Sequence, residues 1–173
     1  MDYAKDLRIT NKFGNGGSGV VYRAVLLDAK LKKQHNIEEV AIKEVMPWEK
    51  LTDEENMARF QQEVSLLWSL AFHPNIATLV GYTEVPQTII TKLYETDLFQ
   101  FLQNPEEDIT PQIAVMLSSQ IAAGISAMHN SGIVHRDIKS ANVLMVNNFS
   151  FSFSCFFFSF GNSNNNPHIC LFK

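Results

Sequence analysis

The ten residues from His135 to Leu144 read H-R-D-I-K-S-A-N-V-L, and this stretch decides the fold of the chain. It brings the carboxylate of Asp137, the ammonium of Lys139 and the amide of Asn142 into one short segment. A segment of mixed charge can also arise as an ordinary surface loop. This one follows a predicted helix and lies downstream of two further motifs, so the three motifs are interpreted as a set.

A glycine cluster, G-N-G-G-S-G at residues 14–19, lies between two runs rich in β-branched residues at 8–13 and 20–27. This arrangement predicts a strand–loop–strand hairpin. Backbone N–H groups approach phosphates closely only where Cβ atoms are absent, which suits such a loop to nucleotide binding. The residues expected to cradle phosphates are Gly14, Asn15, Gly16, Gly17, Ser18 and Gly19.

The pattern G-x-G-x-x-G is weak by itself, because dinucleotide-binding folds and ordinary turns also contain it. Glu38 and Glu39 even lie about 20 residues further on, where a dinucleotide fold places an acidic residue. That fold needs a helix to open at the last glycine. Here V-V-Y-R-A-V follows from Val20, which favours a strand, so we prefer the hairpin.

The second motif is V-A-I-K at residues 40–43, on a third predicted strand over 40–45. A lysine in an apolar strand commonly points outward. The functional interpretation has Lys43 reaching the α- and β-phosphates while a helix-borne carboxylate holds its ammonium. Glu63 is the candidate partner because it lies beside the apolar stripe of the next predicted helix. The alternative is that Glu63 lies on an exposed flank of that stripe and has no such role.

The helix that carries Glu63 is predicted by a capping box, Thr52 with Glu55, followed by apolar residues at helical spacing. Those apolar residues are Met57, Phe60, Val64, Leu67, Trp68 and Ala71. Pro74 is expected to end the helix. Glu54 and Glu55 lie in its first turn, where they serve the cap and the helix dipole, and are poorer partners for the lysine.

The remaining periodic segments complete the coarse layout. Strand-like runs are predicted at 76–82 and 88–94, a short helix at 97–103 and a longer helix at 111–130. Thr110 caps the longer helix, Pro111 occupies its first turn and Ser131-Gly132 ends it. Strands followed by helices predict an α+β fold in two unequal lobes.

Taken together, the three motifs resemble the glycine-rich loop, the strand lysine and the catalytic loop of protein kinases, in the order of that family. The pattern H-R-D with an Asn five residues after the Asp carries most of the resemblance. Lys139 two residues after Asp137 is similar to serine/threonine-type kinases. With H-P-N-I at 73–76, the chain is most similar to the tyrosine-kinase-like group.

The resemblance covers about residues 8–146 and implies a bilobal α+β fold. The small β lobe is expected to be complete and the helical large lobe to be present only in its first part. The expected bounds are about 8–91 for the small lobe, 91–96 for the hinge and 97–146 for the start of the large lobe. The implied activity is transfer of the γ-phosphate of ATP, with Mg²⁺, to Ser/Thr hydroxyls of a protein substrate or signalling partner.

The resemblance also implies roles for individual residues. Asp137 would accept or orient the proton of the substrate hydroxyl, Lys139 would stabilise the transferring phosphoryl group, and Asn142 would bind a Mg²⁺. Arg136 contacts a phosphorylated activation loop in the family. The residues expected around the adenine are Phe13, Val21 and Ala41 above it, Leu144 below it, Thr91 as gatekeeper and Lys92-Leu93-Tyr94 as hinge. Because the segment from 91 to 102 is a residue shorter than usual, Ile90 is an alternative gatekeeper.

The last segment departs from the family pattern. No Asp or Glu follows Asp137, so the D-F-G aspartate that holds a second metal has no acidic counterpart. The tripeptide most similar to D-F-G is Ser159-Phe160-Gly161, and a serine hydroxyl is a poor substitute for a carboxylate as a metal ligand. Residues 147–173 form an Asn/Phe/Ser-rich tail that is expected not to be a domain. The Phe/Ser alternation at 149–154 is compatible with a strand.

Because the acidic metal ligand is missing, we expect a truncated kinase chain with little or no activity. The alternatives are an ATP-binding, pseudokinase-like module and a truncated product without function.

The composition narrows the function classes. Hydrophobic content of 46% and charged content of 18% are typical of a globular rather than a disordered chain. A net charge of −4 without a basic block gives no reason to expect nucleic acid or an anionic membrane surface as a partner. The phenylalanine-rich run at 149–160 is too short to span a bilayer. Two cysteines and an N-terminus without an apolar signal region predict a reducing, cytoplasmic location.

Overall fold

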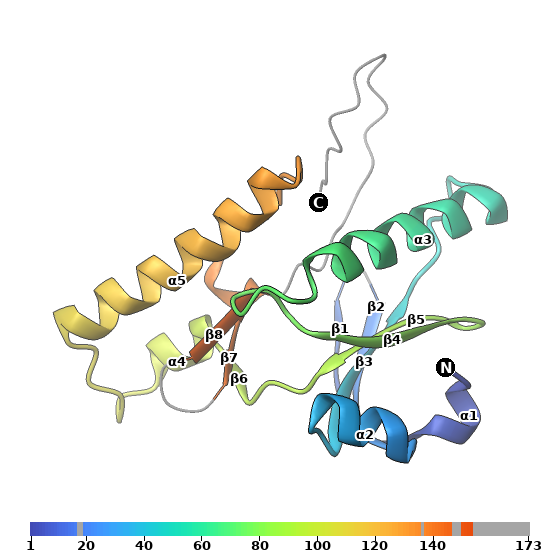
Figure 1. The fold of residues 1–173 in the computed structure, drawn as a ribbon, viewed down its shortest axis with the longest axis horizontal. Coiled ribbons are helices and arrows are strands. Elements are labelled where there is room, and N and C mark those ends of the chain that lie inside the picture. The colour runs from blue at the N-terminus through green and yellow to red at the C-terminus, as the bar shows by residue number, and fades with distance from the viewer. Residues whose placement is uncertain (17–18, 136, 147–149, 154–173) are drawn as a thin grey trace. The chain divides into compact units, whose positions relative to one another are not determined.

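The computed structural model describes residues 1–16, 19–135, 137–146 and 150–153. The chain divides into two compact units. The first comprises Met1–Ser69 and Thr78–Leu93, and the second comprises Leu70–Ala77 and Tyr94–Lys173. Figure 1 shows the first unit as a sheet with helices, and the second as a predominantly helical segment with a small sheet.

The first unit is built on a five-stranded antiparallel sheet with the strand order β1-β2-β3-β5-β4. Its strands are β1 (Leu7–Gly16), β2 (Gly19–Leu26), β3 (Glu39–Val45), β4 (Leu79–Glu84) and β5 (Gln87–Lys92). The predicted glycine hairpin is confirmed, because β1 pairs with β2 from Leu7↔Leu26 to Gly16↔Gly19. Both strands extend into the glycine cluster, so the connection is shorter than the sequence suggested.

One face of this sheet packs on a hydrophobic core beneath two short helices, α1 (Tyr3–Asp6) and α2 (Ala29–His35). The core residues are Leu7, Ala24, Leu26, Val40, Ile42, Val80 and Ile90. Tyr3 from α1 and Leu31 from α2 pack against that core. Neither helix was predicted. Asp28 begins α2 by accepting a hydrogen bond from the Leu31 N–H at 2.7 Å, so its start depends on one local cap rather than on a long periodic pattern.

The long helix α3 (Asp53–Leu70) lies over the opposite face of the sheet from α2 (Figure 1). Its predicted capping box is confirmed: Thr52 N–H donates to Glu55 Oε2 at 2.8 Å, and Glu55 N–H donates to Thr52 Oγ1 at 3.2 Å. The helix ends before the proline expected to stop it. Trp68, one of the apolar residues at helical spacing, is 59% exposed, so the sheet does not cover the whole of that stripe.

The described residues of the second unit form two helices, α4 (Leu98–Gln103) and α5 (Pro111–Asn130), and one 3₁₀ turn, η1 (Ser140–Asn142). The bounds of α5 confirm the prediction: Thr110 Oγ1 accepts from the Ile113 N–H at 3.3 Å at its start, and Gly132 follows its end with a φ of 73°. A small antiparallel sheet, in the order β6-β7-β8, comprises β6 (Thr96–Asp97), β7 (Val143–Val146) and β8 (Ser150–Phe153). The strand predicted from the Phe/Ser alternation at 149–154 is confirmed in part, because β8 covers Ser150–Phe153.

Within the described ranges, no helix combines the length and apolar character needed to cross a membrane.

Candidate active site

Lys43 on β3 and Glu63 on α3 form a buried ion pair within the first unit. Lys43 Nζ lies 3.9 Å from Glu63 Oε1, and the two side chains are only 3% and 4% exposed. The burial of Glu63 answers the question that the sequence left open, since its side chain does not lie on an exposed flank of the helix. Buried charges are tolerated where they are paired, so this carboxylate and this ammonium depend on each other.

A third charged side chain belongs to the same cluster. Arg59 lies one turn before Glu63 on α3, is 7% exposed, and has its guanidinium carbon 4.1 Å from the centre of the Trp48 ring. Burial lowers the pKa of Lys43 below its ordinary value, the Glu63 carboxylate opposes that shift, and the positive charge of Arg59 adds to it. Arg59 is not among the residues predicted for the site, although its i, i+4 spacing to a glutamate is visible in the sequence.

The strand register decides which residues share a face with Lys43. Directly opposed residues of antiparallel strands point to the same side of a sheet. Lys43 is opposite Val21 on β2 and Ile89 on β5, and Ala41 is opposite Thr91. Val21, Ala41 and Thr91 therefore lie on the Lys43 face. Ile90, the alternative gatekeeper, is opposite Ile42 and belongs to the core on the other face.

The described glycines of the predicted phosphate loop lie in the β1–β2 hairpin. Gly14, Asn15 and Gly16 end β1, Gly19 begins β2, and Gly17 and Ser18 lie outside the described residues. Gly19 has a φ of 149°, and a Cβ built on it would lie 2.1 Å from the Glu44 carbonyl oxygen. Only glycine fits this position.

Phe13, expected above the adenine, lies where the β1–β2 register shifts between Lys12 and Gly14, and its side chain is 58% exposed. Leu93, expected in the hinge, is half-buried at the end of the first unit, and the Lys92 N–H before it donates to the Thr78 carbonyl at 3.0 Å.

The second unit holds three residues of the predicted catalytic loop in one hydrogen-bonded group. Lys139 Nζ donates to Asp137 Oδ2 at 2.7 Å. Asn142 Nδ2 donates to the Asp137 carbonyl oxygen at 2.7 Å and to Asp137 Oδ2 at 3.1 Å. The backbone N–H of Asp137 donates to Nδ1 of the buried His135 at 3.2 Å. The structure thus brings together Asp137, Lys139 and Asn142, while Arg136 lies outside the described residues.

This group keeps Asp137 ionised. The hydrogen bond from Lys139 lowers the pKa of Asp137 most, the hydrogen bond from Asn142 and the charge of Lys139 act in the same direction, and burial opposes them. An ionised carboxylate is able to accept a proton from a hydroxyl, whereas a protonated one is not. The turn η1 places Asn142 with its Nδ2 toward Asp137, which leaves the amide oxygen as a hard ligand for a cation.

Two further predictions concern the second unit. Leu144, expected below the adenine, is half-buried on β7 between the buried residues Val143 and Met145, so its side chain points to the other face of that strand. The tripeptide Ser159-Phe160-Gly161, which is similar to D-F-G, lies outside the described residues. Across the described ranges no group of three His, Cys, Asp or Glu residues is arranged to hold a metal ion.

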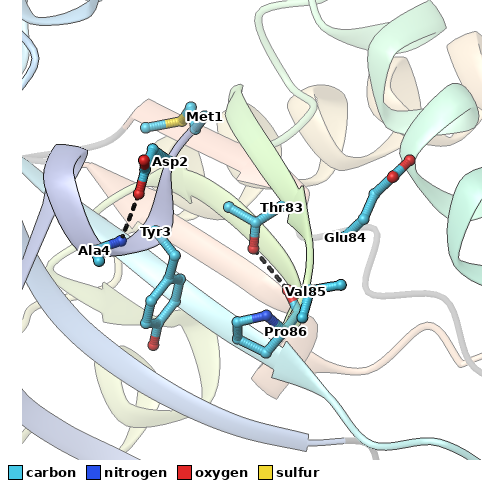
Figure 2. A pocket seen from close by; sticks show the side chains of 8 residues that line it. All are labelled: Met1, Asp2, Tyr3, Ala4, Thr83, Glu84, Val85 and Pro86. Carbon is cyan, nitrogen blue, oxygen red and sulfur yellow. Dashed lines mark hydrogen bonds between the residues drawn. The ribbon is translucent and has the colours of Figure 1, made fainter.

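A surface pocket of about 520 Å³ lies in the first unit (Figure 2). It is lined by residues 1–4 and 83–86, and Thr83 Oγ1 donates to the Pro86 carbonyl oxygen at 2.7 Å beside it. None of the predicted site residues is among those that line it.

Comparison with known proteins gives a consistent result. The family model for protein tyrosine and serine/threonine kinases matches residues 7–160. Serine/threonine-protein kinase PkaA of Streptomyces coelicolor is 36% identical over 140 residues, covering 76% of this chain and 25% of the relative. Wall-associated receptor kinase-like 3 of Arabidopsis thaliana is 34% identical over 145 residues, covering 79% of this chain and 18% of the relative.

The chain thus spans a quarter or less of the length of these two curated relatives. Its five-stranded sheet with α3, and its helices α4 and α5 with the catalytic loop, correspond to the small lobe and the start of the large lobe of the kinase fold. By sequence and by fold, the chain belongs to the protein tyrosine and serine/threonine kinase family.

Proposed function

We propose that this chain binds ATP with Mg²⁺ and transfers the γ-phosphate to Ser/Thr hydroxyls of a protein substrate. The observation that carries this proposal is the arrangement of Asp137, Lys139 and Asn142 around one carboxylate oxygen. Phosphoryl transfer needs a base for the hydroxyl and positive charge near the transferring group, and these residue types supply both. The relatives named above as serine/threonine or receptor kinases support the same reaction class.

In this proposal Asp137 orients the substrate hydroxyl and accepts its proton. Its Oδ2 is held by Lys139 and Asn142, so Oδ1 is the oxygen that faces the substrate. Lys139 shifts part of its hydrogen bonding from Asp137 to the transferring phosphoryl group, which carries negative charge. Bound Mg²⁺ would neutralise charge between the β- and γ-phosphates, and Asn142 would hold it through its amide oxygen.

The first unit supplies the proposed nucleotide site. Lys43 pairs with the α- and β-phosphates, and the glycines of the β1–β2 hairpin let backbone N–H groups approach them. Within this unit the adenine would lie against Val21, Ala41 and Leu93. We propose Thr91 rather than Ile90 as gatekeeper, because the register places Thr91 on the Lys43 face. Lobe bounds of about 8–91 and 97–146, with a hinge at 91–96, belong to the same proposal.

A second candidate function is nucleotide binding with slow or no transfer. It is favoured by the composition of residues 138–173, which include no Asp or Glu to hold a second metal ion. We propose that transfer by this chain is slow for that reason. A cytoplasmic site of action, where ATP is available, is supported by the use of only two cysteines.

The experiment that separates the two candidates is transfer of labelled γ-phosphate from ATP to a library of Ser/Thr- and Tyr-containing peptides. Slow labelling of Ser/Thr peptides that disappears in Asp137→Asn supports the kinase. Saturable ATP binding with labelling no higher than that of Asp137→Asn supports the binding module and rejects the kinase. The Asp137→Asn variant keeps the size of the side chain and removes its charge, so it is a matched control for folding.

A further inference from the structure

The guanidinium of Arg59 is held against the ring of Trp48, which follows β3 in the sequence. The guanidinium carbon lies 4.1 Å from the ring centre, within the range of a cation–π interaction. Arg59 is 7% exposed, and its Nη2 is buried without a hydrogen-bond partner among the described residues. A buried guanidinium is costly unless aromatic contact and a nearby carboxylate stabilise it, so its position needs an explanation.

The Trp48 segment is itself fixed to α3. The Trp48 N–H donates to Asn56 Oδ1 at 2.9 Å, and Asn56 Nδ2 donates to the carbonyl oxygens of Trp48 at 3.2 Å and Leu51 at 3.3 Å. Asn56 is 5% exposed and lies one turn before the arginine on the same helix. The indole, the guanidinium and the helix therefore form one connected assembly inside the first unit.

Arg59 and Lys43 both interact electrostatically with the Glu63 carboxylate. Arg59 and Glu63 are four residues apart on α3 and so share a face of the helix. The three charges sum to +1. Lys43 Nζ is 3.9 Å from Glu63 Oε1, which is longer than the 2.7–2.9 Å typical of a charge-assisted hydrogen bond. A carboxylate that interacts with two cations compensates each of them less completely than it would compensate one.

We infer that Arg59 is a positioning residue, which is held by Trp48, shares Glu63 with Lys43, and so keeps the Lys43 ammonium available to an anionic ligand. The inference rests on the proposed function, because the anion is the phosphate chain of ATP. A cluster with one excess positive charge attracts a phosphate, whereas a neutral Lys–Glu pair does so less. The arginine thus acts through Lys43 and does not itself contact the nucleotide.

The inference predicts a charge effect on Lys43 that a merely structural role would not produce. Among the residues that the structure describes, Glu63 and Arg59, both from α3, act electrostatically on Lys43. Removal of the arginine charge in Arg59→Met should raise the pKa of Lys43, since the arginine disfavours its protonated form. Arg59→Lys keeps a cation and should return this pKa toward the wild-type value.

The titration is measured on the full chain by ¹³C NMR of the lysine Cε, with the Lys43 signal identified by its loss in Lys43→Met. Arg8→Met is the matched control, because Arg8 lies on β1 of the same unit, is exposed and carries the same charge. We expect an upward shift for Arg59→Met and none for Arg8→Met. No shift in Arg59→Met, a downward shift, or an equal shift in the control would overturn the inference.

The same variants are titrated with MgATP by calorimetry. We expect Arg59→Met to weaken binding by about fivefold or more, the lower end of typical coupling between linked sites. Arg8→Met should leave the affinity unchanged and Arg59→Lys should largely restore it. Binding by Arg59→Met that is as tight as wild type would contradict the inference.

Trp48→Leu provides a second route if Arg59→Met does not fold, because it removes the aromatic contact and leaves every charge in the chain. It should raise the pKa of Lys43 by loosening the arginine, and an unchanged Lys43 titration would overturn the inference. The titration needs no nucleotide. Failure of the wild-type chain to bind MgATP would therefore reject the proposed function, while the Lys43 titration would still decide whether Arg59 shares Glu63.

Discussion

Lys43 on β3 and Glu63 on α3 lie 3.9 Å apart, measured from Nζ to Oε1, with both side chains almost completely buried. The pair joins a strand of the sheet to the helix over its face. Each charge needs the other, because a buried charge without a partner carries a large desolvation cost. The pair lies on the face of the sheet that we propose for a nucleotide, and several consequences of the pairing are measurable.

Breaking this pair from one side should destabilise the first unit. Glu63→Leu leaves the Lys43 ammonium buried beside Arg59, and we expect a loss of about 3 kcal/mol in the free energy of unfolding. The double variant Lys43→Met/Glu63→Leu removes both partners and should recover most of that loss. Urea unfolding measures both variants. A double variant that is as unstable as Glu63→Leu would contradict the pairing.

The stability of the chain should depend on pH through Lys43. Its folded pKa is lowered by burial below the ordinary value of 10.5, so the unfolded chain binds more protons between those two values. The contribution of Lys43 to stability should therefore rise as the pH increases from the lowered pKa toward 10.5. Unfolding of the wild type and of Lys43→Met, followed across the alkaline range, isolates this contribution. A difference between them that falls with pH would show that the sign is wrong.

Asp137 should titrate below its ordinary range, with the shift caused mainly by Lys139. Because the folded pKa is depressed, the contribution of this carboxylate to stability is present above the unfolded pKa and is lost as the pH falls through the folded one. Lys139→Met should raise the pKa of Asp137, as measured by ¹³C NMR of its carboxyl carbon. Lys12→Met removes an exposed lysine of the other unit and should have no effect on this signal.

Gly19 should not tolerate a side chain. In Gly19→Ala the Cβ would approach the Glu44 carbonyl oxygen to 2.1 Å at a φ of 149°, so the β2–β3 pairing must shift. We expect a loss of about 3 kcal/mol or more, the upper end of the cost of local strain. Gly132→Ala is the control, because its φ of 73° is strained but nothing lies within 4 Å of the added atom. It should lose about 1 kcal/mol, and equal losses in both variants would contradict the steric argument.

The elements that the sequence predicted well are those with local signals at both ends. Helix α5 was predicted because Thr110 and Pro111 mark its start and Gly132 its end. Helix α2 was missed because seven residues are too few for a periodic pattern, and its start depends on the single cap of Asp28. Trp68 matches the helical spacing of the apolar residues in α3 and is nevertheless exposed, because periodicity shows a stripe without showing how far the sheet covers it.

In the candidate site, too, the sequence predicted the proximity of residues that are close in the chain, but not of residues that the fold brings together. Asp137, Lys139 and Asn142 are close in sequence, so their proximity was predictable from one motif. The placement of Thr91 and Ile90 on opposite faces of the sheet follows from the pairing of β3 with β5, which an uncertain loop length cannot provide. Likewise, the contact of Trp48 with Arg59 joins a loop to a helix, and no local pattern in the sequence indicates it.

We propose that the Lys43 face of the sheet belongs to a nucleotide site. Calorimetric titration of the full chain with MgATP tests it most directly, with Lys43→Met as the variant and Lys12→Met as the control. We predict saturable binding by the wild type and by Lys12→Met, and binding at least about tenfold weaker in Lys43→Met, as for the loss of a buried charged partner. No binding by the wild type, or equal binding by wild type and Lys43→Met, would contradict the claim.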